Sequence, residues 1–186
     1  YDRVTSIGYY FDGGMLVDSV NELSSDYGQL NTESDYAEFR NSVRLKNPDF
    51  VLRTQRLHYN TRTNVADIVK PATIVSDSGF INAVGGWYNT STNESEFWHR
   101  SYVINKHKRL DADTLFYNQK TGIGKGFGKV ILIDSTRNVT LKGEYCYSDE
   151  KRDSALMTKN ALYIDHSSED TLFLHADTLI TFRDQR

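Results

Sequence analysis

The sequence predicts an all-β protein built as a stack of two-strand units. Its composition favours strands, because 12 Tyr and 9 Phe are accompanied by only 2 Pro. Short runs in which apolar and polar residues alternate are separated by clusters of turn-forming residues. A sequence pattern also recurs about every 29 residues, and a fixed period of this length is typical of stacked repeat architectures.

The size and charge of the chain narrow the possible functions. With 186 residues the chain can hold one domain or two small ones and can bury a substantial core. The net charge of -3 comes from interspersed acidic and basic residues, which argues against a nucleic-acid groove or a basic membrane-binding face. The mean hydropathy is -0.58, and no apolar run approaches the ~20 residues of a membrane-spanning helix. The chain begins at Tyr1, so a removed signal peptide is neither shown nor excluded.

The N-terminal part contains the first predicted strands. "MLVDSVNEL" (15–23) and "AEFRNSVRLKN" (37–47) carry spaced apolar residues, including Val43 and Leu45 two positions apart. Between them lies the longer polar segment "SSDYGQLNTESDY" (24–36), which we interpret as an irregularity in the repeat.

The central repeat is marked by tyrosines. "LRTQRLHYN" (52–60) and "LDADTLFYN" (110–118) both end in Leu-x-Tyr-Asn, and "VGGWYN" (84–89) lies halfway between them. Tyr59, Tyr88 and Tyr117 are therefore spaced by 29 residues. "LKGEYCY" continues the series with Tyr147, and "LHADTLITF" (174–182) repeats the Ala-Asp-Thr-Leu of residues 112–115. Each unit reads as a strand that ends near the tyrosine.

A polar turn and a second strand complete each unit. The predicted turns are "NTRTN" (60–64), "NTSTNESE" (89–96), "NQKTG" (118–122) and "SDEKRD" (148–153). The predicted second strands include "ATIVSD" (72–77), "SYVIN" (101–105), "KVILID" (129–134) and "NALYID" (160–165). The nearest helix candidate, "DSALMTKNAL" (153–162), falls where the repeat requires a turn and a strand, so we predict no helix.

The stretch "TGIGKGFGKVILID" (121–134) resembles a phosphate-binding loop only superficially. Its glycines at 122, 124, 126 and 128 match neither G-x-G-x-x-G nor G-x-x-x-x-G-K-[ST], and β-branched residues follow where a helix should begin. Glycine at every second position instead leaves one face of a strand bare, which allows close approach by another segment or by a ligand. We expect Val130 and Leu132 to face the interior.

No catalytic or metal site is predicted. The five histidines (His58, His99, His107, His166 and His175) form neither H-E-x-x-H nor another close ligand pair. His175 with Asp177, and Asp111 with Asp113, could each place two ligands on one strand face, but their repetition favours strand starts or corners. Cys146 is the only cysteine, so no internal disulfide forms, and we expect a buried thiol. We expect no cofactor.

Together these motifs resemble the OstA-like family of lipopolysaccharide transport proteins, also called the LptA type. This family includes the periplasmic bridge protein LptA, its partner LptC, and the N-terminal domain of LptD. The resemblance rests on "ADTLFYN" and in part "ADTLITF", on "GKVILID", on "GGWYN" and "KGEY", and on "FRNSVRLKNPDF". It extends from about Val17 to Phe182, although Asn21 and Leu23 stand where the family pattern has Gly and Tyr. That departure predicts a first rung that is distorted or that caps one end.

The resemblance implies a fold and a function. The fold would be a twisted β-jellyroll, a folded and solenoid-like stack with an apolar groove, over a single domain of residues 1–186 that is compatible with being a piece of a longer chain. The function would be non-enzymatic transport of lipopolysaccharide in the periplasm of a Gram-negative cell, in association with the inner or outer membrane. Partners would be lipid A and other Lpt-type jellyroll domains, including further copies of this one, stacked edge to edge. The groove lining would comprise Val43, Leu45, Leu57, Tyr59, Val75, Val103, Leu115, Tyr117, Val130 and Leu132.

Two other classes of protein remain open from the residues alone. One is a carbohydrate-active or carbohydrate-binding β-solenoid, with Trp87 and Trp98 stacking on sugars and paired carboxylates in a cleft. The other is a structural surface repeat with a closed core. A carrier differs from both because its apolar residues face an open groove.

Overall fold

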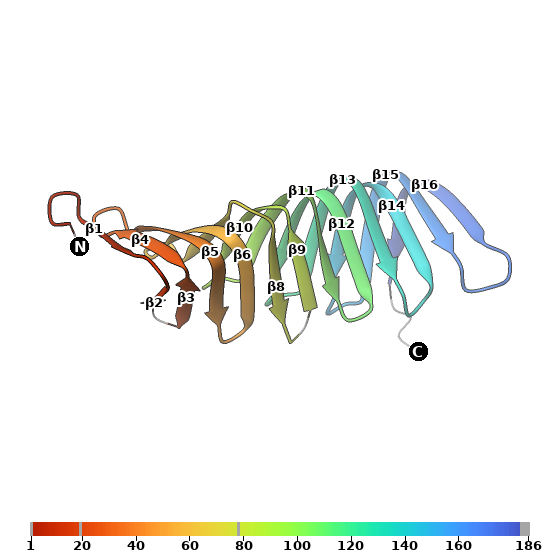
Figure 1. The fold of residues 1–186 in the computed structure, drawn as a ribbon. Coiled ribbons are helices and arrows are strands. Elements are labelled where there is room, and N and C mark those ends of the chain that lie inside the picture. Colours follow the sequence, from red (N-terminus) through yellow and green to blue (C-terminus); the bar gives the residue numbers. More distant parts are fainter. Residues whose placement is uncertain (1, 19, 78, 183–186) are drawn as a thin grey trace. The chain divides into compact units, whose positions relative to one another are not determined.

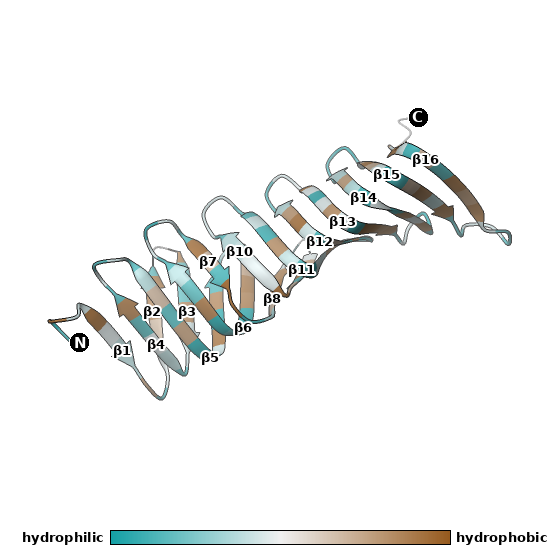
Figure 2. Cartoon of the chain, turned by 90° about the horizontal axis from the view of Figure 1, so that it is seen from above, coloured by the Kyte–Doolittle hydropathy of each residue, from teal (hydrophilic) through white to brown (hydrophobic). Residues whose placement is uncertain are grey.

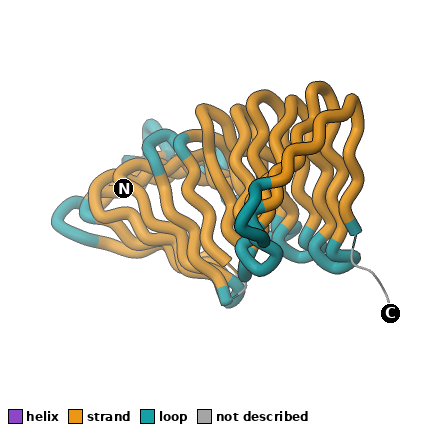
Figure 3. Tube along the Cα trace, turned by 90° about the vertical axis from the view of Figure 1, so that its right-hand side faces the viewer, coloured by secondary structure: helices purple, strands orange, loops and turns teal. Residues whose placement is uncertain are grey.

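The protein is entirely built from antiparallel strands where its structure is described. The computed structural model describes residues 2–18, 20–77 and 79–182, and these form sixteen strands without a helix, so none of the described segments is a membrane-spanning helix. Figures 1 and 3 show this strand-and-loop construction. The chain divides into two compact units, an N-terminal unit of residues 1–95 and a C-terminal unit of residues 96–186.

The N-terminal unit has two walls that share their longest strands. One wall pairs in the order β1-β4-β5-β6-β7-β10 and the other in the order β2-β3-β5-β6-β8-β9, so β5 and β6 belong to both. The strands are β1 (Ile7–Tyr10), β2 (Gly14–Asp18), β3 (Asn21–Ser25), β4 (Tyr27–Asn31), β5 (Tyr36–Asn47), β6 (Phe50–Asn60), β7 (Val65–Ile68), β8 (Ala72–Ser76), β9 (Gly79–Ala83) and β10 (Gly85–Asn89).

The C-terminal unit is a simple meander of long strands. Each strand from β12 to β16 pairs with the one before it in the chain. The strands are β11 (Glu94–Asn105), β12 (Lys108–Asn118), β13 (Ile123–Asp134), β14 (Val139–Asp149), β15 (Ser154–Asp165) and β16 (Leu172–Thr181). This is the strand, turn and strand succession that the repeat predicts.

A corner in the middle of the long strands β5, β11, β13 and β15 turns each of them from one wall into the other. Two consecutive residues adopt positive φ at this point, for example Asn41-Ser42 in β5, Gly128-Lys129 in β13 and Lys159-Asn160 in β15. The pairing register shifts at the same places, as expected for a β-bulge that bends and twists a strand. Asp113 and Asp177 of the repeated Ala-Asp-Thr-Leu lie in these shifts, so the motif marks a corner, as predicted.

The turns that end each strand are held by asparagine or aspartate side chains. The Oδ1 of Asn60 accepts hydrogen bonds from the backbone N–H groups of Arg62 and Thr63 at 3.0 and 2.9 Å. Asn89 and Asn118 make the same kind of bond, which explains why Asn follows Tyr in the repeat. Within Leu-x-Tyr-Asn, the leucine and tyrosine therefore face inward and the asparagine closes the turn.

Most predicted elements are confirmed, and two details are wrong. The segment 24–36 is not an irregularity, because it contains β4, which pairs with both β1 and β5. Tyr147 does not continue the row of Tyr117, because the register places Ser148 there and Cys146 next to it on the inner face. One residue of offset exchanges the two faces of a strand, which a period of about 29 cannot resolve.

Candidate functional site

The interior between the two walls holds nearly all of the predicted lining residues. Every one of them is buried except Val75, whose side chain is 43% exposed. The interior position in β8 belongs instead to Ile74, which is 1% exposed. The alternation "TIVS" allows either face, and the register against β6 and β9 decides it.

Rows of side chains, one from each successive strand, fill this interior. In the N-terminal unit, Leu23, Leu45, Leu52, Ile74 and Ile81 are direct cross-strand neighbours, and all are buried. The matching row of the C-terminal unit runs through Leu110, Leu132, Leu141, Tyr163 and Leu174. This second row loses its cover along the stack, since Leu110 is 6% exposed and Leu174 is 51% exposed.

Opposite the corner, the two walls end in turns that face each other across a mouth. In the N-terminal unit, buried neutral groups close this mouth. Asn21 Nδ2 donates to the Tyr59 hydroxyl at 3.0 Å and to Thr90 Oγ1 at 3.1 Å, while Asn47 Nδ2 donates to Asn21 Oδ1 at 2.7 Å. The Tyr59 hydroxyl also lies 3.0 Å from Asp18 Oδ2. Burial raises the pKa of Tyr59 to about 12, so the group stays a neutral hydroxyl.

Asn21 therefore explains the departure from the family pattern in the first rung. Its amide connects the two sides of the mouth, and its side chain is buried among the partners just described. Further along, the Tyr88 hydroxyl donates to Asn93 Oδ1 at 2.8 Å, and the Tyr88 ring lies 4.7 Å from the ring of Phe50. The N-terminal unit is thus packed and closed.

One row of inner side chains in the C-terminal unit becomes small, and its last two members, Ala155 and Thr181, line a cavity. In the N-terminal unit one row alternates Ala37, Tyr59, Ala66 and Tyr88. The corresponding row within the C-terminal unit is Tyr117, Gly124, Ser148, Ala155 and Thr181. A cavity of about 300 Å³ lies here, and its lining includes Leu132, Leu141 and Ile180.

The glycine stretch of β13 borders a separate, smaller cavity of about 20 Å³, which Gly124 lines together with Leu110 and Tyr117. Gly124 and Gly126 face inward, as predicted, and a Cβ on Gly126 would stand 3.0 Å from a methyl of Val130 and 3.1 Å from Ala112. Gly122 and Gly128 serve another purpose, because they adopt positive φ in a turn and at the corner. The bare face predicted over four positions therefore covers only two.

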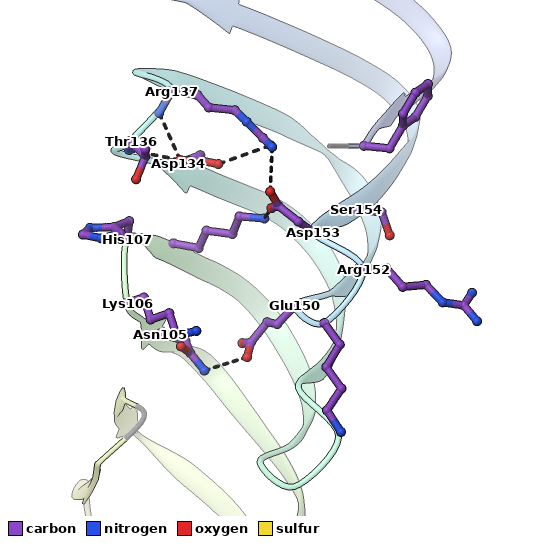
Figure 4. A pocket seen from close by; sticks show the side chains of 13 residues that line it. Asn105, Lys106, His107, Asp134, Thr136, Arg137, Glu150, Arg152, Asp153 and Ser154 are labelled. Atoms are coloured by element: carbon purple, nitrogen blue, oxygen red, sulfur yellow. Dashed lines mark hydrogen bonds and ion pairs between the residues drawn. The ribbon is translucent and has the colours of Figure 1, made fainter. Parts of the chain in front are cut away.

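Charged side chains surround the mouth of the C-terminal unit. Asp153, from the turn after β14, pairs with Lys108 on the opposite side and with Arg137 at 2.7 Å. Arg137 also contacts Asp134 at 3.5 Å, and Asn105 Nδ2 donates to Glu150 Oε2 at 2.6 Å (Figure 4). These pairs cross an open cavity of about 1390 Å³.

Two ionisable groups beneath this mouth have shifted pKa values. Burial raises the pKa of Glu150, whose carboxylate also accepts a hydrogen bond from the Tyr117 hydroxyl at 3.2 Å. Burial raises the pKa of the Cys146 thiol to about 12, so no reactive thiolate is present at neutral pH. As predicted, Cys146 is a buried thiol.

The residues considered for catalysis or metal binding have structural partners. Asp111 forms a bidentate pair with Arg109 at 2.8 Å, and Asp113 lies 3.4 Å from Arg100. Among the described residues, no group of three or more histidine, cysteine or acidic side chains could hold a metal ion. The arrangement offers apolar surface and charge, the chemistry of binding an amphiphile.

The last strand leaves apolar residues uncovered. In β16, Leu172, Phe173, Leu174 and Ile180 are all exposed, and the structure shows β16 pairing only with β15 within the described part of the chain. The start of this strand forms a continuous brown band in Figure 2. Such an edge is suited to adding another strand.

The fold is an LptA-like β-jellyroll: the strands form two walls with an apolar interior, and the mouth lies opposite the corner. The sequence profile of a family described as OstA-like protein matches residues 1–55 and 35–113. These ranges cover more than half of the chain, and the protein belongs to this family.

A solved structure confirms the fold. The crystal structure of LptH from Pseudomonas aeruginosa, described as the LptA-homologous periplasmic component of the lipopolysaccharide transport device, matches with a TM-score of 0.50. The match covers 71% of this chain and 96% of LptH at 14% identity. A search of curated proteins gives no match.

Sequence reasoning missed the charged residues of the mouth. Lys108, Arg137 and Asp153 lie in "NKHKR", "DSTRN" and "SDEKRD", which read as ordinary polar turns. The available signal was that charges gather in these C-terminal turns, whereas "NTRTN" and "NTSTN" of the N-terminal unit are mainly neutral.

Proposed function

We propose that this protein is a non-enzymatic periplasmic carrier of lipopolysaccharide that takes acyl chains into the interior of the C-terminal unit. The observation that carries the proposal is the apolar row Leu110, Leu132 and Leu141, which borders a cavity and loses its cover toward β16. Acyl chains require continuous apolar surface rather than specific bonds, and each buried CH₂ contributes ~0.8 kcal/mol. Family membership and the LptH-like fold support the same role.

Transfer to a neighbour would occur through the strand edges. The exposed apolar residues of β16 and the short strands β1 and β2 suit edge-to-edge pairing with another Lpt-type domain or a second copy. We further propose that residues 1–186 act as one carrier domain in the periplasm, in association with the inner or outer membrane. The continuation of the repeat through both units supports this.

Site-specific photo-crosslinking tests the interior path. A photoreactive residue at Leu132 or Leu141 would give adducts with lipopolysaccharide in a Gram-negative host if these positions line the path. The matched control is Ile133, the next residue in β13, whose side chain lies on the outer face and is 37% exposed. Lys129, another exposed residue of β13, is less suitable as a control because it occupies the strained corner at a φ of 45°.

The adduct pattern decides between the classes of protein. Adducts at Leu132 and Leu141 but not at Ile133 would establish an interior lipid path. Equal labelling at all three positions would indicate adsorption to the surface. Absence of adducts at both inner positions would favour a structural solenoid.

A further inference from the structure

Asp153 occupies a site that is better suited to a doubly charged anion than to one carboxylate. Its two oxygens face different cations, since Oδ1 pairs with Lys108 Nζ and Oδ2 lies 2.7 Å from Arg137 Nη2. Each cation therefore uses a different oxygen of the same carboxylate. A guanidinium and an ammonium side by side are typical ligands of phosphate, because arginine binds two oxygens and lysine adds a point charge.

Basic side chains outnumber acidic ones around the cavity as a whole. Asp134 touches Arg137 at 3.5 Å, but its Oδ1 accepts the backbone N–H groups of Thr136 and Arg137 at 3.0 and 3.1 Å. Glu150 is held by Asn105 and Tyr117. Five basic side chains and three acidic ones line the cavity, namely Lys106, Lys108, Arg137, Lys151 and Arg152 against Asp134, Glu150 and Asp153.

The same two cations also border the apolar cavity. Lys108 and Arg137 line the charged cavity and the 300 Å³ cavity that contains Leu132 and Leu141. An anion held by this pair would therefore have apolar space directly beside it. That combination fits a molecule in which a phosphate is attached to alkyl chains.

We propose that Lys108 and Arg137 form a phosphate-binding site for an anionic amphiphile, and that Asp153 fills this site in the free protein and is displaced when the ligand binds. The inference rests on the proposed carrier function and deepens it, because it assigns the headgroup contact and the opening of the mouth to the same residues. Displacement of Asp153 breaks both of its bonds across the mouth, so headgroup binding and entry of the chains would be coupled.

Calorimetric titration with three probes tests the proposal. The probes are monododecyl phosphate, dodecyl maltoside with the same chain and no charge, and inorganic phosphate, each below its micelle concentration where one exists. Lys108→Gln or Arg137→Gln should weaken binding of monododecyl phosphate about tenfold and leave dodecyl maltoside unchanged. Lys125→Gln on the outer face of β13 is the matched control and should change neither.

The Asp153→Asn variant separates two roles of this carboxylate. If Asp153 competes with the ligand for Lys108 and Arg137, its removal should tighten binding, whereas if it only supports the shape of the site, its removal should weaken binding. Displacement predicts that monododecyl phosphate binds more tightly, since the competing carboxylate is gone. Weaker or unchanged binding to Asp153→Asn would overturn the proposal. This variant also serves if Lys108→Gln or Arg137→Gln fails to fold, which thermal unfolding would reveal.

The three probes distinguish failure of the phosphate site from failure of the carrier function. Equal binding of both amphiphiles, insensitive to Lys108 and Arg137, would overturn the phosphate site and leave the carrier function standing. Inorganic phosphate binding as tightly as monododecyl phosphate would identify a free-anion site and overturn the coupling to alkyl chains. Failure of both amphiphiles to bind would overturn the carrier function itself.

Discussion

The mouths of the two units are bridged by different kinds of side chain. In the N-terminal unit, Asn21, Asn47 and Thr90 are buried and neutral, and they bond across the mouth to each other and to Tyr59. In the C-terminal unit, half-exposed ion pairs centred on Asp153 cross the mouth, and a cavity lies behind them. Partly exposed ion pairs contribute little net stability, whereas buried amides cannot leave their partners without cost. The comparison therefore separates a closed unit from one that can open.

The largest difference between the units should appear in the loss of unfolding free energy when a leucine of an apolar row is replaced by alanine. Leu52→Ala in the N-terminal unit removes a fully buried side chain from packed surroundings and should cost about 3 to 5 kcal/mol. Leu141→Ala occupies the matching position beside an existing cavity, so little new void forms and we expect about 2 kcal/mol. Urea unfolding measures both. Equal losses would mean that the C-terminal interior is as tightly packed as the N-terminal one.

Removing a tyrosine hydroxyl should give a smaller difference in stability between the two units. Tyr59→Phe leaves Asn21 and Asp18 without their shared partner in a buried site and should cost about 2 kcal/mol. Tyr117→Phe leaves Asn105 and Glu150 bonded to each other, so about 1 kcal/mol is expected. Thermal unfolding at neutral pH checks the order. The reverse order would show that the Glu150 cluster is the more tightly held of the two.

The contrast that differs in sign between the two units lies in the pH dependence. Hydrogen bonds from Arg40 and Arg56 on the outer face of the N-terminal unit hold the pKa of Glu38 at about 2, below its ordinary 4.5. Its contribution to stability is present above pH 4.5 and is lost as the pH falls towards 2. Burial raises the pKa of Glu150, so stability instead falls as the pH rises from 4.5 through the folded value.

Two isosteric variants isolate these contributions. Glu38→Gln should cost about 1.5 kcal/mol at pH 7 and remove the acid-side slope. Glu150→Gln should leave stability at pH 7 unchanged or slightly higher and remove the slope above pH 4.5. Urea unfolding from pH 2 to 7 measures both. Parallel pH profiles for the two variants would contradict the opposite shifts assigned to these carboxyls.

Particular residues show how far sequence reasoning reaches. The 29-residue spacing of Tyr59, Tyr88 and Tyr117 predicted strands that end near these tyrosines, and β6, β10 and β12 each end one residue after them. Strand β4 was missed because "YGQLN" is mostly polar and lacks a strand-like alternation, whereas its pairing with β1 and β5 makes it a strand. Val75 was assigned to the wrong face because the alternation in "TIVS" fits either face. Tyr147 was placed in the tyrosine series, although the register puts Ser148 in the row of Tyr117.

The amino-acid sequence by itself determined that this protein is a β repeat with an apolar interior, because alternation and turn chemistry act locally and leave a readable period. It also determined that Gly124 and Gly126 would leave one strand face bare. Only the tertiary structure decided that a cavity lies beside Leu132 and Leu141, and that Lys108, Arg137 and Asp153 meet across a mouth. Those encounters join turns that are distant along the chain, and the corners that bring them together depend on pairs of left-handed residues such as Gly128-Lys129 and Lys159-Asn160.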